Sequence, residues 1–151
     1  MKLEFSGSPT IAAPREQVWE RLMDPHFVAQ SAPGVESVDA IDPTHFKVVS
    51  GFGVGSIKVR FTMDVELFDI VARESARMRV RGKAPGSAID VVSNMKLQDA
   101  GPGNSQLNWS ATSEVSGTVA SVGARLMEGT ARKLTEQFWT DFARRVSEDR
   151  Q

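Results

Sequence analysis

The sequence predicts an α+β fold in which a curved seven-stranded antiparallel sheet wraps around one long C-terminal helix. From Ile57 to Leu67 apolar and polar residues alternate without a break, as in a long strand with one buried and one solvated face. From about Thr118 to Glu148 proline is absent and helix formers dominate. No repeat or linker divides the chain, so we expect one domain over residues 1–151.

The N-terminal segment predicts one strand followed by two short helices. Leu3 and Phe5 share the alternation of an opening strand, and Pro9 places that strand at a sheet edge or bends it. Proline suits the first position of a helix because its missing N–H has no helical partner there. The two helices are predicted at Pro14–Met23 and His26–Ala32.

Six further strands are predicted from the same two-residue alternation. They are expected at Val35–Ile41, His45–Phe52, Ile57–Leu67, Ala76–Gly82, Ala88–Leu97 and Gln106–Val115. Before the long strand, Gly51, Gly53 and Gly55 alternate in GFGVG. No Lys-Ser or Lys-Thr pair follows and a strand comes next, so a flexible or bulged hairpin is favoured over a phosphate-binding loop.

The last segment predicts a single helix of about 46 Å, long enough to cross the whole domain. Its apolar residues recur mostly every fourth position, so the apolar stripe winds around the helix and suits a twisted sheet. Asp141 and Arg145 are spaced for an ion pair on the exposed side. The stripe consists of Val122, Leu126, Leu134, Phe138, Phe142 and Val146.

Composition excludes several function classes. The net charge is −1 and gives no electrostatic reason to expect nucleic acid as a partner. The chain has no cysteine, which rules out disulfides, thiolate metal sites and cysteine nucleophiles. No segment resembles a signal peptide or approaches a membrane span, so we expect a cytoplasmic protein without an integral span.

Residues suited to catalysis are few. His26 and His45 both lie near turn signals, without partners at metal-ligand spacing, and are predicted to be surface residues. Asp64 and Glu66 fall on the solvated face of the long strand. There is no G-x-S-x-G elbow. We therefore expect no catalytic residues and no metal site.

Four stretches of the chain resemble a known family: TIAAPREQVWERLMDP, APGVESV, GFGVGSIKVRFTMDVEL and VSGTVASVGARLMEGTARKLTEQFW. The order of elements resembles the helix-grip fold of the START and Bet v 1-like (SRPBCC) superfamily. Within it, the residues resemble the family of the G subunit of carbon monoxide dehydrogenase over most of the chain.

The resemblance implies an apolar cavity between sheet and helix. It also implies an accessory role beside a molybdenum-containing carbon monoxide dehydrogenase or related hydroxylase. That role would be assembly, recruitment to the inner membrane through the partner, or electron transfer to a quinone held in the cavity. Many members carry a C-terminal extension that reaches the membrane. This sequence ends at Gln151, soon after the predicted helix, so we do not expect direct recruitment by such an extension.

The inward-facing residues suit either an ordinary core or a ligand cavity, and pattern alone favours the core. Ser93, Ala111 and Ser113 fill little space, and several methionines could line an adaptable pocket. Together with the resemblance, these features favour a cavity. Hydroxyls within it would need a partner, either a ligand carbonyl or the backbone and water. The predicted ligand-binding residues are Phe61, Met63, Met78, Ser93, Met95, Trp109, Ser113, Leu126, Met127, Thr130 and Phe138.

The favoured hypothesis is a non-catalytic module that binds a hydrophobic small molecule such as a quinone, with no covalent cofactor. Two alternatives remain open. One is a cyclase or hydrolase of the same fold, which would need titratable groups pointing into the cavity. The other is a pure assembly factor that acts through its outer surface, where Arg77 and Arg79 lie.

Overall fold

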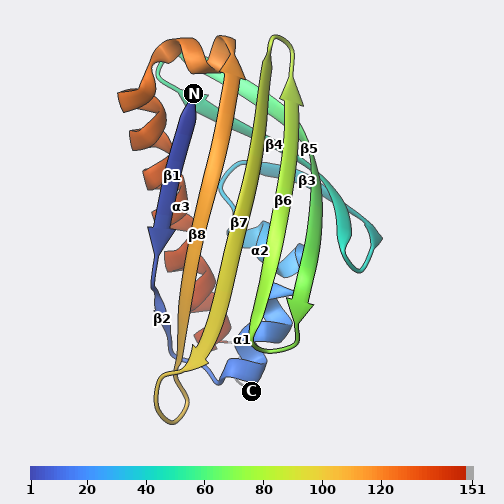
Figure 1. The fold of residues 1–151 in the computed structure, drawn as a ribbon, viewed down its shortest axis with the longest axis vertical. Coiled ribbons are helices and arrows are strands. Elements are labelled where there is room, and N and C mark those ends of the chain that lie inside the picture. The colour runs from blue at the N-terminus through green and yellow to red at the C-terminus, as the bar shows by residue number, and fades with distance from the viewer. Residues whose placement is uncertain (149–151) are drawn as a thin grey trace.

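The computed structural model describes residues 1–148 as one curved sheet with its helices on the concave face (Figure 1). The long C-terminal helix lies behind the first and last strands, and the two short helices lie behind the lower half of the sheet. The elements are β1 (Lys2–Gly7), β2 (Thr10–Ile11), α1 (Arg15–Leu22), α2 (Pro25–Ser31), β3 (Val35–Asp42), β4 (His45–Val54), β5 (Ile57–Val71), β6 (Ser75–Ala84), β7 (Ser87–Asp99), β8 (Ser105–Gly117), the 3-10 helix η1 (Thr118–Val122) and α3 (Ala124–Glu148).

The predicted sheet is confirmed. Its order is β1-β8-β7-β6-β5-β4-β3, with every pair antiparallel and with β2 also on β8. The predicted first strand is divided into β1 and β2 at Pro9, whose carbonyl accepts from the Leu107 N–H at 3.0 Å. The first strand lies at the sheet edge, where the missing N–H of proline breaks no ladder.

The glycine-rich segment forms a hairpin, as predicted. β4 continues to Val54 and β5 starts at Ile57, with Gly55 at a φ of 61° in the turn between them. The long strand β5 also runs past the predicted end at Leu67, as far as Val71. Its ladder with β6 shifts register between Phe68 and Val71. The alternation ends before the strand does because this last part lies at a hairpin end that is largely exposed.

The prediction of one uninterrupted helix from Thr118 was wrong. The 3-10 helix η1 ends at Val122, and Gly123, at a φ of 99°, separates it from α3. A φ of this sign is accessible to glycine and stops a right-handed helix. The segment before Gly123 is TVASV, in which Thr, Val and Ser favour helix only weakly, so a local signal for the break was present and the prediction did not weigh it.

The predicted pair of Asp141 and Arg145 was also wrong. Asp141 instead accepts a hydrogen bond from Arg144 at 2.6 Å, which lowers the pKa of its carboxyl, and Ser31 contributes to that shift. Arg145 turns toward α2, where its guanidinium donates to the Phe27 carbonyl and lies 4.0 Å from the centre of the Phe27 ring. The helical spacing allowed either arginine as the partner, and the position of α2 decided between them.

The buried apolar residues form two separate clusters, one at each end of the concave face. The lower core joins α1, the C-terminal half of α3 and the lower strand ends. The upper core lies below η1 and the start of α3. The lower core contains Ile11, Ala13, Val18, Trp19, Ala76, Leu97, Leu107, Phe142 and Val146. The upper core contains Leu3, Val54, Val59, Phe61, Val115, Val119 and Met127.

Candidate functional site

Between the two cores the concave face is not filled. Two adjoining spaces lie there, one of about 250 Å³ beneath α2 and one of about 140 Å³ next to α3. Leu22, Val28, Leu67 and Met78 line both spaces. Because they share these walls, we treat the two spaces as one cavity, called the inner cavity below.

The sheet wall of the inner cavity follows from strand alternation. On β5, Met63, Val65 and Leu67 point to the concave side, and on β6 Met78 and Val80 do the same. Of these, only Met63 packs against a core cluster, and all remain half-buried. These side chains are inside the fold but lack a packing partner opposite them.

The other wall is made chiefly by α2. Val28 and Ala29 from this helix, and Ala32 and Pro33 after it, face the larger space. The Asp24 side chain caps the helix by accepting from the backbone N–H of His26 at 3.1 Å and of Phe27 at 3.3 Å.

Arg145 fixes α2 against α3 from the opposite side. Besides the Phe27 carbonyl, it donates to Ser31 Oγ at 2.6 Å and to Gln30 Oε1 at 2.7 Å. Arg145 therefore helps to hold α2 over the cavity, together with the contact of Phe27 with Phe142.

The upper boundary of the cavity depends on a glycine. A Cβ built on Gly82 of β6 would lie 2.6 Å from Ile89 Cγ2 and 3.0 Å from Met63 Cγ. Because Gly82 has no side chain, Ile89, Met63 and Phe61 can pack directly against β6 at this position. Above Gly82 the concave face is packed, and below it the face opens into the cavity.

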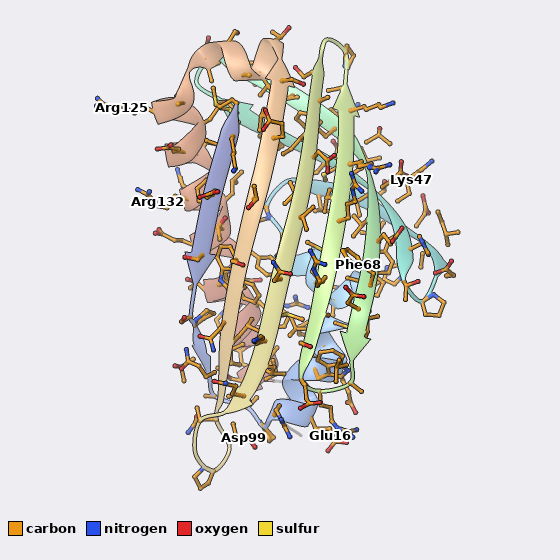
Figure 2. The ribbon with its side chains drawn as sticks, viewed as in Figure 1. Glu16, Lys47, Phe68, Asp99, Arg125 and Arg132 are labelled. Atoms are coloured by element: carbon orange, nitrogen blue, oxygen red, sulfur yellow. The ribbon has the colours of Figure 1, made fainter. Side chains whose placement is uncertain are left out.

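The chemistry of the lining is almost entirely apolar. Ser50 and Ser93 supply hydroxyls, and no aspartate, glutamate or histidine lies among the residues that line the two spaces. Arg77 borders the smaller space, but its guanidinium is engaged on the outer face with Asn94, at 2.7 Å, and with the Phe68 ring. Figure 2 shows Phe68 on the face of the sheet that points away from the helices.

In residues 1–148 no group of histidine, aspartate and glutamate side chains is arranged to hold a metal ion. No helix of that part of the chain is long and apolar enough to cross a membrane.

The structure brings part of the predicted ligand-binding set together. Met63 and Met78 line the larger space. The smaller space is lined by Met78, Ser93, Met95, Trp109 and Phe138. Their role in ligand binding stays a prediction, which their common position supports.

The remaining predicted residues lie elsewhere, which corrects the expected lining. Phe61 and Met127 are part of the upper core, and Ser113 is buried outside the cavity. Leu126 is 42% exposed and, with Thr130, borders a shallow depression at the start of α3. Leu126, Met127 and Thr130 lie in the first turns of α3 near the upper core, whereas the cavity is bordered by the later residues Phe138 and Trp139.

Sequence reasoning missed the contribution of α2 and of strands β3 and β4. Val28, Ala29 and Val48 face the larger space, and Trp139 borders the smaller one. One signal was available, because the second short helix carries Phe27, Val28 and Ala29 in succession, which is unusually apolar for an exposed helix.

Both histidines are exposed, as predicted. His45 Nδ1 lies 2.9 Å from Asp42 Oδ1, and its Nε2 lies 3.3 Å from Glu66 Oε2. The hydrogen bond to Asp42 raises the pKa of His45, and the same contact lowers the pKa of Asp42 to about 2. These residues do not line the inner cavity.

Comparison with known proteins identifies the family. The family model for the G subunit of carbon monoxide dehydrogenase (CoxG) matches residues 7–147. The chain belongs to the CoxG family. The matched range includes every element that lines the inner cavity, so this CoxG-family protein carries the cavity within the part that defines the family. No curated protein sequence matches the chain.

Solved structures show the same fold. A conserved protein from Geobacillus kaustophilus has a TM-score of 0.90 at 23% identity, covering 99% of this chain and 98% of that one. A START superfamily protein from Mycobacterium smegmatis has a TM-score of 0.72 at 12% identity, with 96% and 97% covered. The ZhuI aromatase/cyclase from Streptomyces sp. R1128 has a TM-score of 0.71 at 16% identity, with 97% and 94% covered. The fold is therefore the START and Bet v 1-like helix-grip fold, and family and fold together support a domain that binds hydrophobic ligands.

Proposed function

We propose that this CoxG-family protein binds a quinone or a similar isoprenoid in the inner cavity, without catalysing a reaction on it. It would serve a molybdenum-containing carbon monoxide dehydrogenase or a related hydroxylase. The observation that carries the proposal is the unfilled, almost wholly apolar cavity between two packed cores.

The size and lining of the cavity support a small hydrophobic guest. Together the two spaces reach the lower part of the range of about 300–1,000 Å³ that is common for ligand pockets. Each CH₂ group that leaves water for such walls contributes about 0.8 kcal/mol. Apart from the Ser50 and Ser93 hydroxyls and Arg77, whose guanidinium is engaged on the outer face, the lining residues offer apolar contacts to such a guest.

A role in acid–base catalysis lacks support from the cavity walls. Cyclase or hydrolase chemistry of this kind needs a group that gives or takes a proton within hydrogen-bond reach of the substrate. Among the residues that line the two described spaces there is no carboxylate and no imidazole. The aromatase/cyclase activity named for the Streptomyces protein is therefore not carried over to this chain.

Quinone titration tests the binding step. Trp109 and Trp139 border the smaller space, whereas Trp19 lies in the lower core. Menadione and ubiquinone-1 are expected to cause a saturable loss of tryptophan emission, and native mass spectrometry of freshly purified protein should show a bound apolar molecule. The proposal would be contradicted if no quinone quenched the tryptophan emission and native mass spectrometry showed no bound molecule.

A matched pair of variants on β6 provides the control. Val80 faces the cavity and its neighbour Arg81 faces solvent on the other side of the sheet. Val80→Phe fills cavity volume and should weaken quinone binding, while Arg81→Phe adds the same ring outside the cavity and should leave binding unchanged. Equal effects of the two variants would mean that the quinone binds elsewhere.

The partner is tested separately from the ligand. Tagged protein produced in its native host should co-purify with subunits of a molybdenum hydroxylase, identified by mass spectrometry. If Arg77→Ala or Arg79→Ala abolishes this co-purification and Val80→Phe has no effect on partner activity, the protein is an assembly factor that acts through its outer surface.

A further inference from the structure

A second recess, the β1–α3 groove, lies outside the inner cavity. It is an open groove of about 430 Å³ between the edge strand β1 and the outer side of α3. Unlike the inner cavity it has a mixed lining, with the Thr135 and Thr140 hydroxyls and the charged residues Glu4, Arg132 and Glu136. In Figure 2, Arg132 projects outward from α3 beside β1.

The groove and the inner cavity share one wall. Trp109 of β8 and Trp139 of α3 line both the groove and the smaller inner space. The two rings stack with their centroids 6.1 Å apart and their planes at 27°. The groove and the smaller inner space therefore adjoin at this pair of side chains.

Trp109 is held by packing alone. Its Nε1 is buried and has no hydrogen-bond partner in the part of the chain that the structure describes. Buried indole N–H groups normally have a hydrogen-bond partner, so Trp109 Nε1 is an exception. The ring lies against Gly7, where a Cβ would come within 2.7 Å of Nε1. Rotation of the ring would therefore break packing contacts with Gly7 and Trp139 but no hydrogen bond.

We propose that the ligand is an amphipathic molecule bound in one direction, with a neutral polar end in the β1–α3 groove and its apolar body in the inner cavity. The inference rests on the proposed function, because it concerns the ligand of the same cavity. In this arrangement the molecule runs from the groove into the inner cavity past Trp109 and Trp139.

The lining determines the expected chemistry of each end. Two carboxylates, Glu4 and Glu136, and one guanidinium, Arg132, line the groove, so its negative balance disfavours an anionic end while Arg132 offsets part of the attraction for a cation. Hydroxyl groups are available instead, and Thr135 Oγ1 donates to the Ala131 carbonyl at 2.7 Å, which leaves its lone pairs free to accept. At the other end, beneath α2, the larger space has the most apolar walls. A hydroxyl group, which can donate to Thr135 Oγ1, or an ester or ketone, which can accept from the Thr140 hydroxyl, suits the first end. A hydrocarbon suits the second end.

The direction of binding can be measured by fluorescence quenching in a Trp19→Phe variant, in which Trp109 and Trp139 are the remaining tryptophans. The probes are methyl 5-doxylstearate, with the nitroxide near the ester, and methyl 16-doxylstearate, with the nitroxide near the far end of the chain. At equal occupancy, the first probe should quench tryptophan emission at least about twofold more than the second, because its nitroxide lies beside the tryptophan pair.

Equal quenching, or stronger quenching by methyl 16-doxylstearate, would overturn the proposed direction while leaving ligand binding intact. If neither ester nor any quinone binds, the proposed function and this inference both fail. The two failures are therefore distinguishable.

Blocking the groove gives a second, independent measurement. Because the chain has no cysteine, a single introduced cysteine can be coupled to a bulky maleimide. Glu136 lines the groove, whereas its exposed neighbour Gln137 does not. Coupling at Glu136→Cys should weaken methyl 5-doxylstearate binding by about tenfold, a change of about 1.4 kcal/mol, and coupling at Gln137→Cys should not change it. The same affinity for both coupled proteins would overturn the assignment of the groove.

Discussion

The ends and the middle of the concave face differ in packing although the same strands build both. On β6, Ala76 is buried in the lower core and Gly82 is buried beneath Ile89 and Met63. Between them, Met78 and Val80 remain half-buried and line the inner cavity. One alternating strand thus passes through a packed region, an open region and a packed region.

The difference lies in what stands opposite the strand. At the lower end, Phe142 and Val146 of α3 are fully buried, and at the upper end Met127 performs the same role. In the middle, the small residues Ala29 of α2 and Ala32 just after it face the strand. Alternation therefore identifies the inner face of a strand, but whether that face is filled depends on the partner element.

The largest expected contrast comes from deleting side chains at the two places. Phe142 is fully buried and contacts the rings of Phe27, Phe138 and Trp139. Phe142→Ala should lower the free energy of unfolding by about 3–5 kcal/mol, because it leaves a new cavity in a packed core.

Met78→Ala removes atoms that already face the inner cavity and should cost only about 1 kcal/mol. Urea denaturation of both variants measures the difference. Similar losses would mean that the middle of the face is as tightly packed as the lower core.

Enlarging a side chain should also cost more in a core than at the cavity wall. Val115 in the upper core is 1% exposed, so Val115→Phe should cost about 1–3 kcal/mol or more through overpacking. Val80→Phe enters existing space and should change stability by less than about 1 kcal/mol. Thermal unfolding of the two variants in the absence of ligand is the appropriate measurement, and equal destabilisation would show that the cavity closes in solution.

The stability of the cavity wall made by α2 should depend on Arg145 and not on the neighbouring Arg144. Arg145→Met removes three hydrogen bonds to α2 and the contact with the Phe27 ring, and should destabilise by about 1–3 kcal/mol. Arg144→Met removes only exposed ion pairs with Asp141 and Glu148 and should cost less than about 1 kcal/mol. Hydrogen exchange of α2 amides should rise in the first variant only.

The smallest effect concerns the exposed β3–β4 turn, which belongs to neither core. The raised pKa of His45 means that its protonated form stabilises the fold fully below about pH 6.5 and loses this contribution as the pH rises through the raised value. The pKa of Asp42, lowered to about 2, gives a contribution present above pH 3.8 that is lost as the pH falls through about 2.

His45→Gln should remove the first of these dependences, so stability measured from pH 6 to 9 should become flatter than in the unchanged protein. An unchanged pH profile would show that the His45 contact with Asp42 is absent in solution.

The sequence determined where the seven predicted strands lie along the chain and which side chains face inward, because strand alternation is a local property of the chain. It also determined the absence of thiol chemistry, since the chain has no cysteine. The position of Pro9 similarly indicated that the first strand lies at an edge or bends there, because proline cannot donate to a ladder, and the structure shows an edge strand divided at Pro9.

The tertiary structure alone decided which inner residues line a cavity. Phe61 and Met63 share one strand face, yet Phe61 is packed under the upper core and Met63 borders open space. The break at Gly123, the turn of Arg145 toward α2 and the placement of α2 over the sheet all changed which side chains meet. These outcomes depend on contacts between elements distant in the chain, and packing of that kind leaves no periodic signal in the sequence.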